Sequence, residues 1–230
     1  MNQKIAWVTG GRGGIGSAVL NKLCYEEMGF WKVLSVGRGE DNDIVCDVSS
    51  QEDVMKMTVK EPKPDVLVTC HAADALHSTI EDMMNIDVLG VHYICLHSVT
   101  NMIKNEWGRI INLTSYHTQG TYPNREAYCA AKSGVAGYSR SLALTLAKHN
   151  ITVNCVAPGV TETPRTRKFI QEGLVDEERL LKRTPLRRFV EPFEVADLVA
   201  FLASDKASAI TGQEIIIDNG YTISNYPGDY

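Results

Sequence analysis

Short apolar runs alternate along the chain with longer segments in which apolar residues recur every three or four positions. The short runs predict buried strands and the longer segments predict helices. The predicted strands cover residues 4–10, 32–37, 43–48, 65–72, 108–115, 151–159 and 213–220. The predicted helices cover residues 17–29, with Gly29 near the helix end, 80–104, 125–149 and 191–204.

The strands are apolar throughout, without the alternation of a half-exposed sheet. This favours a parallel sheet covered by helices on both faces, which is the doubly wound α/β architecture. The sequence contains no linker, repeat or low-complexity segment, so we expect one domain over residues 1–230. A charged stretch at about residues 161–190 predicts a loop-and-helix insertion that resembles a lid.

Composition narrows the class of protein without identifying it. The chain has 230 residues and a net charge of -5 with no basic block, which argues against nucleic-acid binding. No apolar stretch approaches the roughly twenty residues of a membrane span, and the start of the chain has no apolar segment of signal length. Six single cysteines have no metal-ligand spacing. We expect a cytoplasmic protein with reduced thiols, no membrane or nucleic-acid partner and no metal.

The first predicted strand leads into a glycine-rich loop. Residues 9–16 read TGGRGGIG and contain Gly11-x-Gly13-x-x-Gly16, followed by a predicted helix. Such a loop lets the backbone approach a pyrophosphate at the positive end of a helix. The expected dinucleotide contacts here are Gly10, Arg12, Gly13, Gly14, Ile15 and Gly16. The alternative is a tight turn without a ligand.

The end of the second predicted strand concerns the choice of cofactor. An acidic residue there would bind the ribose hydroxyls of NAD, but Gly37 is followed by Arg38. Arg12 and Arg38 together would suit a 2′-phosphate. NADP(H) is therefore favoured and NAD(H) stays possible, because Arg38 could instead face solvent. Asp41 and Asp43 lie too far into the loop to be assigned to a ribose.

A serine, a tyrosine and a lysine form the second candidate for chemistry. Tyr128 stands thirteen positions after Ser115, and Lys132 follows four positions later. Residues four apart share one face of a helix. Free tyrosine titrates near pH ~10, and a nearby ammonium favours the phenolate, which aids proton exchange. The alternative is a core tyrosine with a surface lysine.

With the loop, this spacing and the chain length, the sequence resembles the short-chain dehydrogenase/reductase family, and especially the branch of the 3-oxoacyl-carrier-protein reductases. The resemblance covers nearly the whole chain, including NCVAPGVTET and the C-terminal segment from 192 to 220. It implies one Rossmann-type domain, assembled as a homodimer or homotetramer. It also implies that Tyr128 is the general acid, that Lys132 holds the nicotinamide ribose, and that Ser115 donates a hydrogen bond to the substrate carbonyl.

The resemblance implies further cofactor contacts. Asp47 and Val48 would lie at the adenine; Pro158, Gly159 and Val160 would line the nicotinamide; and Thr163 would bind the carboxamide or the phosphates.

Three departures from the family pattern stand out. The usual Asn-Asn-Ala-Gly reads Thr69-Cys70-His71-Ala72, so His71 and Ala72 would run beneath the cofactor, His71 more as a packed loop residue than as a catalytic one. Asp87 replaces the asparagine that holds a relay water, and its carboxylate would keep Lys132 charged. Nine residues separate Gly37 from Asp47, too few for the usual helix, which would leave the adenine end exposed.

The substrate side is less defined. The insertion carries arginines and lysines that could meet an anionic substrate, or it could be a solvated amphipathic helix. Tyr116, His117, Gln119 and Tyr122 would wall the pocket and suggest a modest polar substrate. Glu106 and His149 stand where basic residues for an acidic carrier protein would be expected, which lowers that option.

Two hypotheses remain. The leading one is an NADP(H)-dependent oxidoreductase that interconverts a ketone and a secondary alcohol, acting on a 3-oxoacyl thioester or on a small polyol, sugar or hydroxy acid. The alternative is a weak or inactive dinucleotide-binding regulator or partner subunit. Small and apolar residues on several faces of the two long helices favour self-association, and residues 224–230 would form a tail or a subunit contact.

Overall fold

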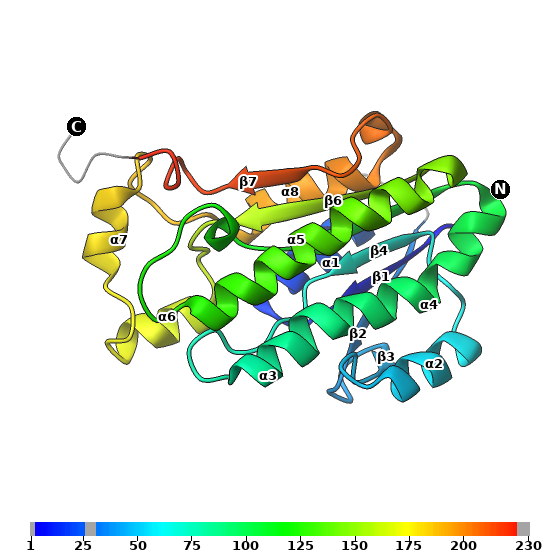
Figure 1. The fold of residues 1–230 in the computed structure, drawn as a ribbon, viewed down its shortest axis with the longest axis horizontal. Coiled ribbons are helices and arrows are strands. Elements are labelled where there is room, and N and C mark those ends of the chain that lie inside the picture. The colour runs from blue at the N-terminus through cyan, green and yellow to red at the C-terminus, as the bar shows by residue number, and fades with distance from the viewer. Residues whose placement is uncertain (1–2, 26–30, 225–230) are drawn as a thin grey trace.

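The computed structural model describes residues 3–25 and 31–224. Its seven strands run parallel in one sheet, in the order β3-β2-β1-β4-β5-β6-β7 (Figure 1). The strands are β1 (Ile5–Thr9), β2 (Lys32–Gly37), β3 (Ile44–Val45), β4 (Val66–Thr69), β5 (Gly108–Leu113), β6 (Ile151–Pro158) and β7 (Glu214–Ile217). The α/β fold class expected from the sequence is therefore confirmed.

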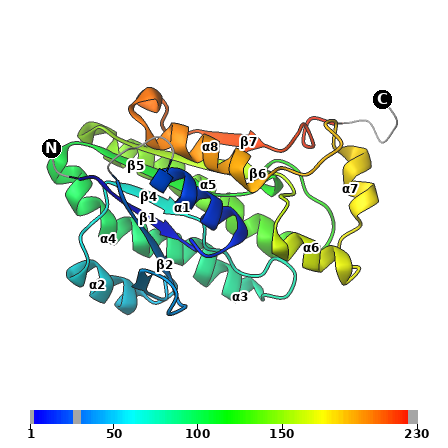
Figure 2. The same cartoon turned by 180° about the vertical axis from the view of Figure 1, so that it is seen from behind.

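Helices cover both faces of the sheet, and each face has its own core. On one face lie α1 (Gly14–Tyr25) and α8 (Pro192–Ala203), which are in front in Figure 2. On the other face lie α2 (Gln51–Lys60), α4 (Gly90–Asn105) and α5 (Glu126–Leu146). In β1, Ala6 and Val8 pack in the first core and Trp7 packs in the second, and none of the three is exposed. A strand buried on both faces has no polar side to expose, which explains the continuous apolar runs.

Shorter elements complete the fold. They are α3 (Ile80–Met83), the π-helix η1 (Met84–Leu89), α6 (Pro164–Gln171), α7 (Glu177–Arg183) and the 3-10 helices η2 (Tyr116–Thr118), η3 (Ala147–His149) and η4 (Asp205–Ala207). The helices α6 and α7 lie beyond the carboxyl ends of the strands (Figure 1). The long helix predicted at 80–104 is thus divided, with a π-helical segment between two α-helical ones.

Two other expectations on this side of the sheet need correction. The helix α2 was not predicted, because only Val54, Met57 and Thr58 of its ten residues are buried. A better signal was the cap, where the Ser50 side chain accepts a hydrogen bond from the Asp53 amide. Strand β3 is two residues long, shorter than 43–48, because it pairs only with β2 at the sheet edge.

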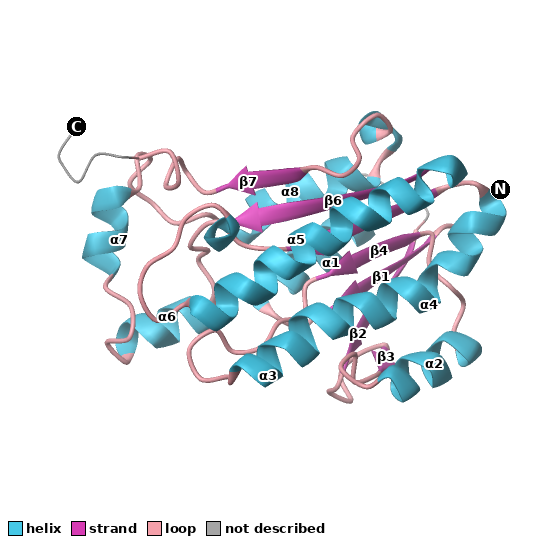
Figure 3. Ribbon diagram, viewed as in Figure 1, coloured by secondary structure: helices cyan, strands magenta, loops and turns pink. Residues whose placement is uncertain are grey.

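The short connection between β2 and β3 contains no helix, in agreement with its length (Figure 3). Within the described ranges, no helix is long and apolar enough to cross a membrane, and no three His, Cys, Asp or Glu side chains cluster as metal ligands would. The predicted helix end at Gly29 lies outside the described residues, as does nearly all of the predicted tail at 224–230.

Candidate active site

The strand order reverses at β1, whose neighbours are β2 and β4. In open α/β sheets, ligands bind at such a switch point, beyond the carboxyl ends of the strands. A cavity of about 780 Å³ lies here. Its lining includes most of the expected cofactor contacts: Gly10, Arg12, Gly13, Gly14, Ile15, Gly16, Arg38, Asp47, Val48, His71, Ala72, Tyr128, Lys132, Pro158 and Thr163. It also includes residues that sequence reasoning did not assign to this site, among them Asp74, Ser78, Ile86 and Arg165.

The glycine loop is shaped by backbone contacts that a side chain would prevent. Gly10 has a φ of +64°, and a Cβ there would lie 2.8 Å from the His71 nitrogen. A Cβ on Gly16 would lie 2.2 Å from the Gly10 carbonyl oxygen. The loop ends in the first turn of α1, which contains no acidic residue. Its free N–H groups and positive helix end therefore fit a pyrophosphate.

Charged side chains after β2 lie beside this cavity. Arg38 lines it, and the Arg12 Nε lies 3.9 Å from the Asp41 Oδ2. Asp41 is therefore close to the glycine loop, although its sequence position did not suggest this. Asp43 instead faces the sheet: its Oδ2 accepts hydrogen bonds from the Ser35 amide and hydroxyl, and these hold the pKa of Asp43 below its usual value.

His71 is a packed loop residue at the edge of the same cavity. Its Nδ1 lies 2.6 Å from the Thr9 hydroxyl, and its Nε2 faces Gly90, where a Cβ would lie 3.1 Å away. Burial lowers the pKa of His71 to about 4, so the ring is neutral near pH 7. The glycine at the start of α4 thus leaves room for the imidazole of His71.

Tyr128 joins the first cavity to a second one of about 220 Å³. Lys132 lines the first cavity, with its Nζ 5.7 Å from the centre of the Tyr128 ring. Ser115 lines the second, and so do Gly159 and Val160, which were expected near the nicotinamide. The chain therefore brings the serine, the tyrosine and the lysine together where the two cavities meet.

Asp87 forms a buried ion pair behind this junction. Its Oδ2 lies 3.3 Å from the Lys132 Nζ, and its Oδ1 accepts a hydrogen bond from the Ala73 amide at 2.7 Å. Burial is the largest single effect and lowers the pKa of Lys132, but the Asp87 carboxylate, together with Tyr128 and Cys70, raises this pKa overall, so the lysine is charged. Asp87 lies in the π-helix η1, and π-helical turns are frequent at functional sites.

His117 contacts Ser115 and faces Tyr128. Its Nδ1 lies 3.2 Å from the Ser115 Oγ, and its ring is perpendicular to that of Tyr128, with centres 5.3 Å apart. Burial, with a smaller contribution from Arg125, lowers the pKa of His117 to about 4. Tyr116 and Tyr122 also line this second cavity as predicted, but Gln119 does not, because its amide is turned away toward Glu214.

The two neutral histidines make stability depend on pH. A histidine whose pKa is lower in the folded state takes up a proton on unfolding, so its stabilising contribution is present above pH 6.5 and is lost as pH falls toward 4. We expect the free energy of unfolding, measured with urea, to be roughly 2 kcal/mol lower per histidine at pH 5 than at pH 7. The variants His71→Gln and His117→Gln should each flatten this slope, whereas equal slopes in all three proteins would contradict the assignment.

Several basic side chains of the charged insertion form ion pairs. Arg167 pairs with Glu162 and Glu177, and Arg188 pairs with Glu194. Further pairs join Lys168 to Glu172 and Lys182 to Glu178. Arg167, Lys168, Lys182 and Arg188 are therefore solvated ion-pair partners.

Comparison with known proteins places the chain in a family. A family model described as Enoyl-(Acyl carrier protein) reductase matches residues 32–222. The 3-oxoacyl-[acyl-carrier-protein] reductase of Rickettsia felis is 32% identical and covers 94% of this chain and 96% of its own. The reductase of that name from Thermotoga maritima is 40% identical, over 75% of this chain and 72% of its own.

Solved structures agree over nearly the full length. A variant of the actinorhodin polyketide ketoreductase with NADPH has a TM-score of 0.86 and 28% identity, covering 97% of this chain and 98% of its own. The aldohexose dehydrogenase of Thermoplasma acidophilum has a TM-score of 0.87 and 26% identity, covering 100% of this chain and 97% of its own. The chain thus belongs to the short-chain dehydrogenase/reductase family of NAD(P)-binding oxidoreductases and is similar to the 3-oxoacyl-[acyl-carrier-protein] reductases.

Proposed function

We propose that this protein is an NADP(H)-dependent oxidoreductase that interconverts a ketone and a secondary alcohol, with Tyr128 as its general acid and base. The observation that carries the proposal is the position of Tyr128 between the two cavities, with Lys132 on one side and Ser115 on the other. A proton donor at that junction can reach a carbonyl in the smaller cavity beside a nicotinamide in the larger one.

The residues of the larger cavity fit a dinucleotide. The glycine loop and the start of α1 would hold the pyrophosphate, and Lys132 would hold the nicotinamide ribose, with Pro158 and Thr163 beside it. Gly159 and Val160 would meet the nicotinamide from the side of the smaller cavity. When bound, such a cofactor supplies or accepts the hydride of the reaction.

The chain's own residues would manage the proton and the developing charge. In the reducing direction Tyr128 gives its hydroxyl proton to the substrate oxygen, and in the oxidising direction it takes that proton back. The Ser115 hydroxyl donates a hydrogen bond to the same oxygen as negative charge develops there. The charged Lys132, held by Asp87, favours the phenolate of Tyr128 and so aids both directions.

Asp87 could still serve the relay that the family builds with asparagine. Its Oδ1 is occupied by the Ala73 amide, while its Oδ2 contacts Lys132 without accepting an aligned hydrogen bond among the described residues. That oxygen can accept a hydrogen bond from a relay water. We therefore keep Asp87 as a positioning residue that acts through Lys132.

The preference for NADP(H) is supported by Arg12 in the glycine loop and Arg38 after β2, which both line the larger cavity. The ion pair between Arg12 and Asp41 is exposed and long, so it contributes little and can open. We expect nicotinamide fluorescence titrations to show tighter binding of NADPH than of NADH. Arg38→Ala should weaken NADPH binding by about 10- to 100-fold, the range of one or two charge-assisted hydrogen bonds.

NADH is the internal control in this titration, because it lacks the 2′-phosphate. Its affinity should be unchanged in Arg38→Ala. Equal loss of both cofactors in the variant would indicate damage to the fold, and tighter binding of NADH by the unaltered protein would reject the phosphate site but leave the Tyr128 chemistry standing.

The structure of the insertion at 161–190 supports the proposal that this segment is a lid over the smaller cavity. Its ends are joined, because Thr161 and Val190 form a bridge and the Val190 amide donates to the Val160 carbonyl at 2.9 Å. Phe169, Val175 and Leu180 of the insertion line the cavity. A segment held at a narrow base can open while the sheet stays fixed.

Two classes of substrate are compatible with the proposed reaction. A 3-oxoacyl thioester agrees with the named relatives, while the small cavity with its tyrosines and His117 suits a compact polar ketone. The alternative of an inactive dinucleotide-binding subunit predicts cofactor binding without turnover on any ketone. Assembly as a homodimer or homotetramer stays a prediction, supported by the exposed Leu96 on α4 and Leu144 on α5.

A further inference from the structure

A third cavity adjoins the smaller one beside Tyr128. It has a volume of about 430 Å³ and shares Tyr122, Arg125, Val175 and Leu180 with that neighbour. Its other walls come from α7, the turn before α7, and Tyr221. A substrate whose carbonyl reaches Tyr128 can therefore extend into this space.

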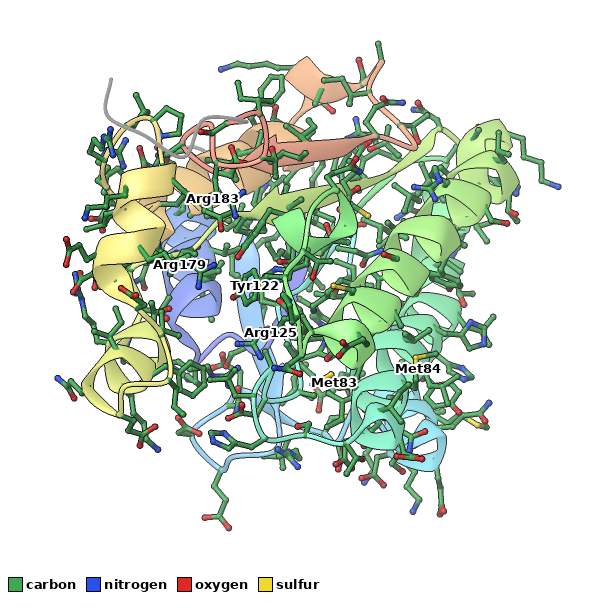
Figure 4. All side chains as sticks on the ribbon, turned by 60° about the vertical axis from the view of Figure 1, so that its left-hand side comes forward. Met83, Met84, Tyr122, Arg125, Arg179 and Arg183 are labelled. Carbon is green, nitrogen blue, oxygen red and sulfur yellow. The ribbon has the colours of Figure 1, made fainter. Side chains whose placement is uncertain are left out.

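Three arginines line this third cavity. Arg125 precedes α5, and Arg179 and Arg183 lie one turn apart on α7. Figure 4 shows the two α7 side chains pointing toward Tyr122 and Arg125. We call Arg125, Arg179 and Arg183 the arginine pocket.

None of these three guanidinium groups forms an ion pair within the part of the chain that the structure describes. The same insertion supplies carboxylates to three of its other cations, Arg167, Lys168 and Lys182. The cavity holds one acid, Asp176, whose Oδ1 caps α7 by accepting a hydrogen bond from the Arg179 amide at 3.0 Å. The arginine pocket therefore carries an excess of positive charge.

Aromatic rings fix two of the three guanidinium groups. The Arg183 group lies 4.5 Å from the centre of the Tyr221 ring, and the Arg125 group lies 5.2 Å from that of Tyr122. Both side chains are half-buried, whereas Arg179 is exposed. A guanidinium held on an aromatic face is oriented before a ligand arrives and loses less freedom on binding.

The positive charge of the arginine pocket also affects the pKa values of neighbouring side chains. Arg125 contributes to lowering the pKa of His117, after the larger effect of burial. Arg183 and Arg179 oppose the rise that burial causes in the pKa of Tyr221. Both effects have the sign of a field that favours anions.

We propose that the arginine pocket binds an anionic group, a carboxylate or a phosphate, at the end of the substrate remote from the reacting carbonyl. Planar guanidinium forks match both oxyanions and can bind them bidentately. The substrate is then a ketone, or the corresponding secondary alcohol, that carries an acid group. This inference rests on the proposed function, because it assigns the substrate of the same site.

The test is calorimetric titration of the full chain saturated with NADP⁺. The probes are 4-oxopentanoate, 5-oxohexanoate, 6-oxoheptanoate and their neutral methyl esters, and a second series in which a phosphate monoester replaces the carboxylate and the free alcohol is the neutral partner. We expect at least one acid to bind about 10- to 100-fold more tightly than its neutral partner. The series with the larger ratio identifies the anion.

Variants assign the effect to the arginines. Arg179→Gln and Arg183→Gln should each lower the affinity for the acid by tenfold or more, leave the neutral partner within about threefold, and raise KM more than they lower kcat. Lys182→Gln is the matched control, because this substitution also removes one positive charge from α7. Lys182 itself pairs with Glu178 and does not line the cavity. It should change the affinity by less than about twofold.

Two results would overturn the inference: acids that bind no more tightly than their neutral partners, or a Lys182→Gln loss equal to that of the arginine variants. Measurements of turnover distinguish a failure of this inference from a failure of the proposed function. If neutral ketones were reduced with NADPH but acids bound no more tightly, only the anion site in the arginine pocket would be rejected. Acid binding that depends on Arg179, without reduction of any ketone, would reject the oxidoreductase proposal and keep the anion site.

Discussion

Replacing Tyr128 with phenylalanine is expected to lower kcat by about 10²- to 10⁴-fold, the contribution of a positioned proton donor. The substitution removes one hydroxyl and keeps the ring that faces His117 and Lys132. The cofactor cavity keeps its glycine loop, so the affinity for NADPH should stay within about threefold. Steady-state kinetics with NADPH and a reducible ketone, paired with a fluorescence titration, measures both quantities.

Tyr138→Phe is the matched control for this substitution. Tyr138 lies on the same helix α5 but packs in the core against His92, away from both cavities. Its loss should leave kcat within about twofold. If Tyr128→Phe retained full turnover, another group would have to supply the proton. If the unaltered protein bound NADPH but reduced no ketone, the hypothesis of a dinucleotide-binding regulator would take its place.

Replacing Asp87 with leucine is expected to lower the free energy of unfolding by about 3 to 5 kcal/mol. Leucine has a similar size but leaves the buried Lys132 ammonium without its counter-charge and the Ala73 amide without its acceptor. Stabilities of native domains are about 5 to 15 kcal/mol, so this loss is a large fraction of the total. Urea unfolding followed by circular dichroism at pH 7 measures it.

Asp87→Asn separates the charge from the hydrogen bond. The asparagine Oδ1 can still accept a hydrogen bond from the Ala73 amide, so the variant should fold. The pKa of Lys132 should fall, because the strongest of the contributions that oppose burial is lost. The alkaline limb of kcat/KM against pH should then move to lower pH. Since the pKa of Lys132 is raised in the folded state, the ion pair stabilises fully below pH 10.5 and loses this effect as pH rises further. An asparagine variant as stable as the unaltered protein at pH 7 would show that the carboxylate does not hold the lysine.

The local sequence was sufficient to predict the elements that are marked by a pattern of a few consecutive residues. The apolar runs identified the central strands β1, β4, β5 and β6 because these are buried on both faces. The glycine loop was recognisable because Gly10 and Gly16 meet backbone where a Cβ would clash. Strand β3 and helix α2 were less legible. Strand β3 pairs with one neighbouring strand only, and helix α2 buries a stripe of three residues. Short or narrow burial of this kind leaves a weak apolar pattern in the sequence.

The candidate site divides in the same way. The sequence by itself determined the serine, tyrosine and lysine, because a helix places residues four apart on one face, and it suggested Asp87 beside Lys132. Only the tertiary structure decided that Gln119 turns away to Glu214, that Asp41 comes within reach of Arg12, and that Arg125 faces two arginines more than fifty residues later in the chain. Those contacts join segments that are distant in sequence, and their geometry is set by how helices pack on the sheet, which no local pattern encodes.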